Sequence, residues 1–286
     1  FIYFKTSRIS GAIQLVRTLL NESNINCVTT GGGSIKFFDS LQNELKNVKK
    51  RDEFDCLILG LNNLLKYSTD QVYYIEKSLS NNEILKIPLS LPVKKDFYPF
   101  ILANVGSGCS FLLVESKTRF RRVGGSILGG SCFLGLLKLI LKENISYEQG
   151  MEMAKEGVIR NVSSTIGDIY GGNYDKFNLD SSTIAAAFGK VASLKMEQVN
   201  IDKNDKSSAL LHMVCLNIAQ ISYLFAKSYS VKNILFSGSF LRHQSTNSLT
   251  SAFISESITY WSENKFRALF LKHEGYLGAF GCLFTD

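Results

Sequence analysis

The sequence predicts an α/β protein with a mixed β-sheet in each of two lobes. Segments of strand character alternate with segments of helical periodicity along the chain, and this alternation is typical of the class. The clearest local pattern covers residues 98–114, where two apolar runs flank Gly106-Ser107-Gly108 and predict strand, tight turn and strand. The chain has 286 residues, of which 45% are hydrophobic and 20% charged, enough for one large domain or two lobes.

The first hundred residues are expected to hold short strands and two amphipathic helices. Apolar side chains recur at helical spacing over residues 10–20 and 52–67. The expected strands cover residues 1–4, 25–29, 72–75 and 84–89. Three glycines at 31–33 follow the second strand and predict a turn or a close backbone approach. The polar segment 68–92 is expected to connect two lobes or to form an irregular sheet edge.

The helix over 52–67 carries a candidate catalytic side chain at its start. Asp52 has the residue type and the position of an N-cap, with Asp55 three residues further on. Glu53 then lies in the first turn, where the helix dipole favours a carboxylate and keeps it ionised at neutral pH. Acidic residues are common at helix starts, so the spacing alone favours the simpler interpretation that Glu53 is an ordinary first-turn residue without a catalytic role.

Two glycine-rich segments are candidate ligand sites. Glycines in the 106–108 turn let the backbone approach a ligand closely and can point several N–H groups one way, which suits a phosphate. A plain hairpin is an equally good interpretation of this turn by itself. Gly129-Gly130 precede an apolar helix predicted over 133–142, and a helix N-terminus attracts anions.

The elements beyond residue 130 continue the alternation. The helix over 133–142 is apolar on nearly every side and is expected to be buried. Ser146 and Gln149 form a capping box for the next helix, which Gly157 closes. The remaining expected elements are a helix over 205–228, a strand over 233–236, a helix over 247–262, a strand over 268–271 and a final helix. Glycines at 275, 278 and 281 give that final helix a thin face for close packing.

Composition disfavours several classes of protein. No apolar run approaches the ~20 residues that span a bilayer, and no signal peptide opens the chain, which does not begin with Met. The six cysteines form no CxxC pair and lie beside apolar residues, so reduced thiols in a compartment such as the cytosol are expected. The three histidines have no metal-ligand spacing. The net charge of +7 is scattered, and its densest run, 46–51, lacks interleaved aromatics, so a solvated face is favoured over nucleic-acid binding.

Eight segments carry a family signature: Thr30–Phe37, Asp52–Leu57, Asn104–Ser110, Arg122–Gly130, Phe133–Gly135, Asp168–Gly172, Ser237–Arg242 and His273–Tyr276. Together they resemble the eukaryotic-type (type II) pantothenate kinases, in that family's order and at its spacing. One such motif would be weak, whereas a set of this size in register along the chain is specific.

The resemblance implies an actin-like, sugar-kinase type of ATPase fold with mixed sheets in two lobes and ATP in the cleft between them. Residues 1–97 would be the remainder of the amino-terminal lobe, and residues 98–286 the carboxy-terminal nucleotide-binding and dimerisation lobe. The implied reaction uses ATP and Mg2+ to phosphorylate the primary alcohol of pantothenate, the first step of coenzyme A biosynthesis. The resemblance also implies a cytoplasmic homodimer that acetyl-CoA or another acyl-CoA inhibits. Another sugar-type kinase is less favoured, because the Asp52 and His273 segments fit the first family better.

The resemblance also assigns roles to individual residues. Glu53 matches the catalytic base, which takes the proton from the attacking hydroxyl. The matches to the nucleotide-binding or coenzyme A-binding positions are Ser107, Gly108, Ser110, Arg122, Gly129, Gly130 and Gly238. No protein ligand to a metal is assigned. Tyr260-Trp261 resemble an aromatic pair of the pantothenate pocket near the dimer interface, and core packing is an equally good interpretation of them.

Departures from the family pattern define an alternative. The family's Asp-Ile-Gly-Gly-Thr strand pair and following lysine, which hold the ATP phosphates and magnesium, have no counterpart in this sequence. We therefore expect the chain as given to be inactive alone. A non-catalytic acyl-CoA-binding subunit of a heterodimer is the second hypothesis. Smaller departures are Cys109, Gly124 and Ser239, where an apolar residue, a threonine and an asparagine are typical.

Overall fold

The computed structural model describes residues 2, 4, 8–20, 27–45, 47–67, 71–77, 84–89, 97–195, 200–241, 247–272 and 276–285. The α-helices are α1 Ile9–Leu20, α2 Gly31–Lys36, α3 Phe38–Glu44, α4 Glu53–Tyr67, α5 Gly130–Leu141, α6 Tyr147–Glu156, α7 Ile166–Tyr170, α8 Gly189–Ala192, α9 Lys203–Ser228, α10 Asn247–Ser262 and α11 Leu277–Cys282. The strands are β1 Cys27–Thr29, β2 Val48–Lys50, β3 Val72–Lys77, β4 Ile84–Pro88, β5 Phe100–Val105, β6 Cys109–Val114, β7 Phe120–Ser126, β8 Ser164–Thr165, β9 Ile184–Ala186, β10 Asn233–Ser237 and β11 Arg267–Leu271.

A seven-stranded mixed sheet in the order β4-β3-β11-β10-β5-β6-β7 organises the molecule. Strands β11, β10 and β5 are parallel, because helical connections return the chain to the same edge. The other neighbours in this sheet pair antiparallel. The predicted α/β class with a mixed sheet is confirmed.

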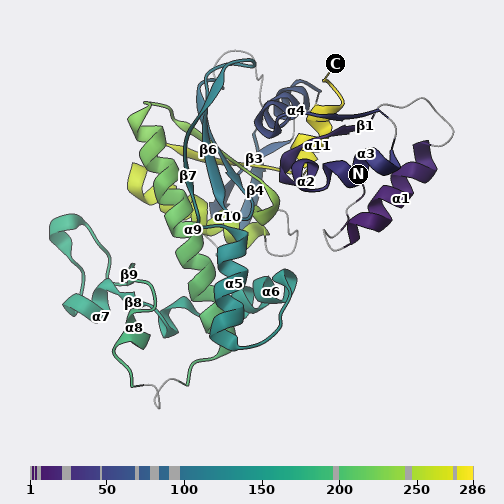
Figure 1. Ribbon diagram of the computed structural model, residues 1–286. Helices are drawn as coiled ribbons and strands as arrows, with labels where there is room; N and C mark the ends of the chain where they lie inside the picture. The colour runs from purple at the N-terminus through teal and green to yellow at the C-terminus, as the bar shows by residue number, and fades with distance from the viewer. Residues whose placement is uncertain are drawn as a thin grey trace.

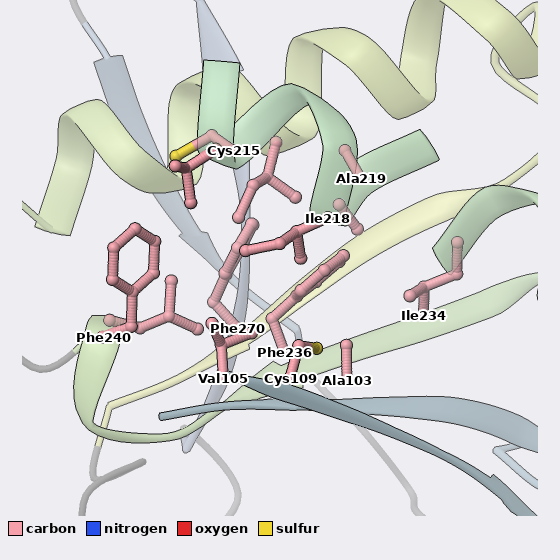
Figure 2. Close-up of a cluster of buried hydrophobic side chains, with 14 of the residues drawn as sticks. Ala103, Val105, Cys109, Cys215, Ile218, Ala219, Ile234, Phe236, Phe240 and Phe270 are labelled. Atoms are coloured by element: carbon pink, nitrogen blue, oxygen red, sulfur yellow. The ribbon is translucent and has the colours of Figure 1, made fainter. Parts of the chain in front are cut away.

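Helices cover both faces of this sheet. On one face, α4 and α11 pack against apolar side chains such as Leu102 and Leu112. On the other face, α5, α6, α9 and α10 enclose a larger cluster that includes Phe236 and Phe270. Figure 2 shows part of this second cluster, with Phe236, Phe270 and Ile218 directed toward one another. Side chains of successive strand residues alternate between the two faces, as the pleat requires.

A smaller unit lies beside the α4–α11 face. Strands β1 and β2 form a parallel pair in which Thr29 lies opposite Lys50, and helices α1, α2 and α3 lie alongside (Figure 1). The strand predicted over 1–4 falls largely outside the described residues. Strands β3 and β4 precede residue 97 but are hydrogen-bonded into the large sheet through β11. The division of the chain at residue 97 stays a prediction.

Two local expectations need refinement. Gly31–Gly33 form the first turn of α2 rather than a plain turn, although Gly31 has a positive φ of 77°. Helix α5 is buried only in part: Phe133 and Leu137 face the core, while the side chain of Leu139 is 74% exposed. Apolar residues of α5 therefore lie on its exposed face as well as on its buried face. Because both faces are apolar, the sequence pattern could not tell them apart.

Helix α9 is the longest helix among the described residues. It alone in that part of the chain has the length and hydropathy of a membrane-crossing helix. Half of its most apolar 18-residue window is buried within the protein, where Leu211, Val214 and Ile218 join the larger apolar cluster. Core helices meet the same criterion, so α9 is weak support for a membrane span.

Candidate functional site

The carboxyl ends of β1 and β2 start two helices at the same edge. Strand β1 leads into α2 at Gly31, and β2 leads into α4 at Glu53. The Thr30 hydroxyl ties the two connections together, because its Oγ1 lies 3.1 Å from the carbonyl oxygens of both Arg51 and Asp52 and donates to them. This bridge fixes the start of α4 relative to the glycine turn.

Glu53 lies in the first turn of α4, as predicted. The Asp52 carboxylate caps the helix: its Oδ1 accepts hydrogen bonds from the N–H groups of Phe54 at 2.8 Å and Asp55 at 3.0 Å. The Glu53 side chain is exposed, and its Oε2 lies 3.8 Å from the point that a Cβ on Gly31 would occupy. A carboxylate therefore lies over the glycine-rich start of α2, where solvent and a ligand can reach it.

The second half of α4 is anchored beside the large sheet through Asn62. Asn62 lies in α4, nine residues after Glu53. Its Nδ2 donates a hydrogen bond to the carbonyl oxygen of Lys117 at 2.6 Å, and its Oδ1 accepts one from the Tyr98 hydroxyl. Both partners lie at the end of β5 opposite to the glycine turn, so this contact holds the second half of α4 beside the start of β5.

The glycine-rich hairpin and the start of α5 are packed backbone to backbone. The N–H of Gly130 donates to the carbonyl oxygen of Gly106 at 2.8 Å, and that of Ser131 donates to Ser107 at 3.2 Å. A Cβ on Gly129 would lie 2.7 Å from the Ser107 carbonyl oxygen, so this position requires glycine. Two N–H groups of the α5 first turn are thus already bonded within the protein, and they position the 106–108 turn.

A third segment joins this cradle from β10. Gly238 has a φ of 108°, and a Cβ there would lie 2.3 Å from the carbonyl oxygen of Val105. Both the left-handed conformation and the close approach require glycine. The turn after β10 therefore lies directly beside the 106–108 turn, and the structure brings together three of the segments that the sequence singled out.

A row of polar side chains crosses three strands below this cradle. Ser237, Asn104 and Ser110 lie opposite one another in register on β10, β5 and β6. The Ser237 hydroxyl donates to Asn104 Oδ1 at 3.2 Å. All three face the same side as Leu102 and Leu112, the side that α4 covers. Asn104 and Ser237 were not predicted as site residues, although polar residues at inward positions of apolar strands are a usable signal.

Arg122 extends this row from β7. Its Nε donates to Ser110 Oγ at 3.5 Å, and its guanidinium covers Gly125, where a Cβ would lie 2.2 Å from the guanidinium nitrogen. Burial raises the pKa of the neighbouring Cys109 thiol to about 12, and the charge of Arg122 opposes this only in part. Arg122 is therefore an exposed cation beside the Ser110 hydroxyl and a thiol that is protonated at neutral pH.

The departure at Gly124 has a packing reason. A Cβ at this position would lie 2.4 Å from the Phe225 ring of α9, and Phe225 in turn packs against Phe111 with ring centroids 5.3 Å apart. A threonine there would collide with this ring unless α9 moved. The absence of a side chain at Gly124 leaves room for the large ring of Phe225, so the total side-chain volume at this point of the core is conserved.

Tyr260 and Trp261 lie away from the cradle, at the carboxyl end of α10. They line a cleft of about 360 Å³ together with His212 of α9 and Arg160 and Thr183 of the segment between α6 and α9. Tyr260 is 45% exposed and its hydroxyl donates to Asn178 O at 3.3 Å. Burial lowers the pKa of His212, and Glu256 opposes the shift. Trp261 is partly buried against the larger apolar cluster, whereas Tyr260 is exposed in the cleft.

No group of three or more His, Cys, Asp and Glu side chains suited to a metal occurs within the described ranges. The His273–Glu274–Gly275 part of the last motif lies outside the described residues. The described residues thus place an exposed carboxylate, an exposed guanidinium, hydroxyl groups and a tight backbone cradle at the positions that the sequence singled out.

Comparisons with known proteins add a family to this geometry. A family model described as Fumble matches residues 1–285. A pantothenate kinase of Schizosaccharomyces pombe is 37% identical over 293 residues, covering 98% of this chain and 70% of the yeast protein. Pantothenate kinase 2 of Oryza sativa subsp. japonica is 34% identical over 302 residues, covering 100% of this chain and 32% of the rice protein.

Two further similarities broaden the comparison. A protein of Mus musculus named 4'-phosphopantetheine phosphatase is 34% identical over 283 residues, covering 98% of this chain and 33% of the mouse protein. The chain thus spans about a third of the length of the rice and mouse relatives. The solved structure of the ethanolamine utilization protein EutJ from Carboxydothermus hydrogenoformans covers 96% of this chain and 74% of its own, at 13% identity and a TM-score of 0.46.

Proposed function

The chain belongs to the Fumble family, and from this premise we propose that the full-length protein phosphorylates the primary alcohol of pantothenate with ATP to give 4'-phosphopantothenate. The observation that carries the proposal is the exposed Glu53 carboxylate at the capped start of α4, beside the glycine-rich start of α2 at Gly31. A base in this position can accept the proton of an attacking hydroxyl.

We assign the nucleotide to the cradle formed by the hairpin, the start of α5 and the turn after β10. Ser107 and Ser110 offer hydroxyl groups, and Gly108, Gly129, Gly130 and Gly238 provide a thin backbone surface. Arg122 supplies a planar cation that suits phosphate or carboxylate oxygens better than lysine. Phosphoryl transfer depends mainly on positioning and charge neutralisation, which these groups supply.

The remaining ligands and partners are proposals that the family resemblance suggests. Mg2+ would neutralise negative charge on the phosphates of ATP, and we assign it no protein ligand. Pantothenate would lie between Glu53 and the cradle, with the Tyr260–Trp261 cleft of a second subunit as an additional contact. We also propose acyl-CoA as an inhibitor and a homodimer as the working form. A cytosolic location is supported by six cysteines that are all free thiols.

The test is a kinase assay on the full-length protein with pantothenate and Mg-ATP, comparing the unmodified protein with Glu53→Gln. We expect Glu53→Gln to lower kcat by about 10²–10⁴-fold, because the base is lost, while nucleotide affinity stays unchanged. Asp55→Asn is the matched control, since it removes a negative charge from the same helical turn without touching the proposed base. Its kcat should stay close to that of the unmodified protein.

Two outcomes would overturn the proposal. One is a folded full-length protein that forms no phosphopantothenate, and binding of coenzyme A without ATP would then favour a non-catalytic subunit. The other is an equal loss of kcat in Glu53→Gln and Asp55→Asn, because a general effect of charge would then explain both variants.

A further inference from the structure

Two cysteines face each other between α4 and α11. The Sγ atoms of Cys56 and Cys282 lie 3.6 Å apart, although the residues are 226 positions apart in the chain. Cys56 is fully buried and Cys282 is 8% exposed. Neither residue belongs to the site described above, and both are thiols in this structure.

The backbones of the two helices are in direct contact around this pair. A Cβ on Gly281 would lie 1.8 Å from the carbonyl oxygen of Cys56 itself, and a Cβ on Gly60 would lie 2.0 Å from that of Leu277. Glycines on both helices thus allow an approach that larger residues would prevent. This close packing of the two helices brings the two sulfur atoms to 3.6 Å from each other.

We propose that Cys56 and Cys282 are an oxidant-responsive thiol pair that forms an intramolecular disulfide with hydrogen peroxide as the oxidant. The Cys282 thiolate attacks the peroxide O–O bond, so that Cys282 becomes a sulfenic acid and its proton and the released hydroxide leave as water. The Cys56 sulfur then attacks the Cys282 sulfur and displaces a second water. The two sulfurs need to approach from 3.6 Å to about 2.05 Å.

Cys282 is the residue that reacts first. It has measurable exposure whereas Cys56 has none, and it is the last residue of the six-residue helix α11, where helix ends open most easily. Burial raises the pKa of its thiol to about 12, with Cys56 and Cys27 adding to the shift and Arg51 opposing it. The thiolate fraction is therefore small at pH 7 and grows with pH.

The crosslink would join α11 to the unit that carries Glu53. Cys56 lies one turn after Glu53 in α4, and α11 also packs on β1, because a Cβ on Gly278 would lie 3.5 Å from Thr30 Cγ2. Closing a loop of this length limits the unfolded chain strongly. The oxidised protein should therefore unfold at a temperature higher by several degrees.

The experiment treats the native full-length protein with hydrogen peroxide at pH 7 and pH 8, blocks remaining thiols, and maps disulfides by mass spectrometry without reduction. We expect a Cys56–Cys282 crosslinked peptide that a thiol reductant removes, and an initial rate about tenfold higher at pH 8, as the thiolate fraction requires. Cys282→Ala should abolish the crosslink. Cys215→Ala is the matched control, because Cys215 is fully buried in the larger apolar cluster, away from α4 and α11, and should leave the crosslink intact.

Three results would overturn the inference: no crosslink in folded, peroxide-treated protein, a crosslink of Cys282 to Cys27 instead of Cys56, or a rate independent of pH. The wild-type map decides the first two without any variant, so a failure of Cys282→Ala to fold does not affect the test.

Discussion

The two faces of the seven-stranded sheet are covered in different ways. On the α9–α10 face, large side chains such as Phe236 and Phe270 fill the space, with ring centroids 5.5 Å apart. On the α4–α11 face, the backbones of the helices touch at Gly60 and Gly281. Apolar side chains pack on both faces, and on the second the two covering helices, α4 and α11, also make close backbone contacts at these glycines.

This difference separates stability from chemistry. The α9–α10 face buries the larger apolar cluster and contributes most of the hydrophobic free energy of folding. The α4–α11 face carries the exposed Glu53, the polar row of Asn104 and Ser237, and the cysteine pair. Close backbone packing at Gly60 and Gly281 brings distant parts of the chain together there. Larger residues at these two glycines would therefore be poorly tolerated.

The largest expected effect is on the backbone contact. Gly281→Ala should lower the free energy of unfolding by about 3 kcal/mol, because its Cβ would collide with the carbonyl oxygen of Cys56 and force the helices apart. Urea unfolding of the purified protein measures this change. The control is Gly135→Ala on α5, where no atom lies within 4 Å of the added Cβ, and which should raise stability by about 0.5–1 kcal/mol. Equal effects of the two substitutions would remove the contrast between the faces.

A smaller effect is expected at the bridge between β1 and α4. Thr30→Val keeps the shape of the side chain but loses the hydroxyl that donates to Arg51 and Asp52, and should cost about 1 kcal/mol. Thr30→Ser retains the hydroxyl and should lie close to the unmodified protein. Thermal unfolding of both variants tests this, and a Val variant as stable as the Ser variant would show that the bridge is dispensable.

The smallest effect concerns pH and belongs to the opposite face. Burial against Phe253 lowers the pKa of His212 below its ordinary 6.5, with Glu256 opposing. The unfolded state then binds this proton more tightly, so stability is complete above pH 6.5 and declines as pH falls below it. His212→Gln should flatten this decline between pH 7 and pH 5 in denaturant titrations. An unchanged slope would show that His212 titrates normally.

Local sequence patterns predicted much of the fold. The capping residue Asp52, the capping box at Ser146 and the glycine turn at 106–108 appear where expected, because each depends on residues a few positions apart. The outward-facing Leu139 and the helical start at Gly31 were not predicted, since both depend on which neighbours happen to cover them. Asn104 and Ser237 were missed for a related reason: each is one polar residue in an apolar strand until the other strand is placed beside it.

The sequence by itself determined the family, the alternation of strands and helices, and the position of Glu53 in the first turn of a capped helix, because these depend on short-range spacing and on motifs that are read in order. Only the tertiary structure decided that Ser237 bonds to Asn104, that Gly130 donates to Gly106, and that Cys56 meets Cys282. Such contacts join segments far apart in the chain, and their geometry is set by how whole elements pack rather than by any local preference.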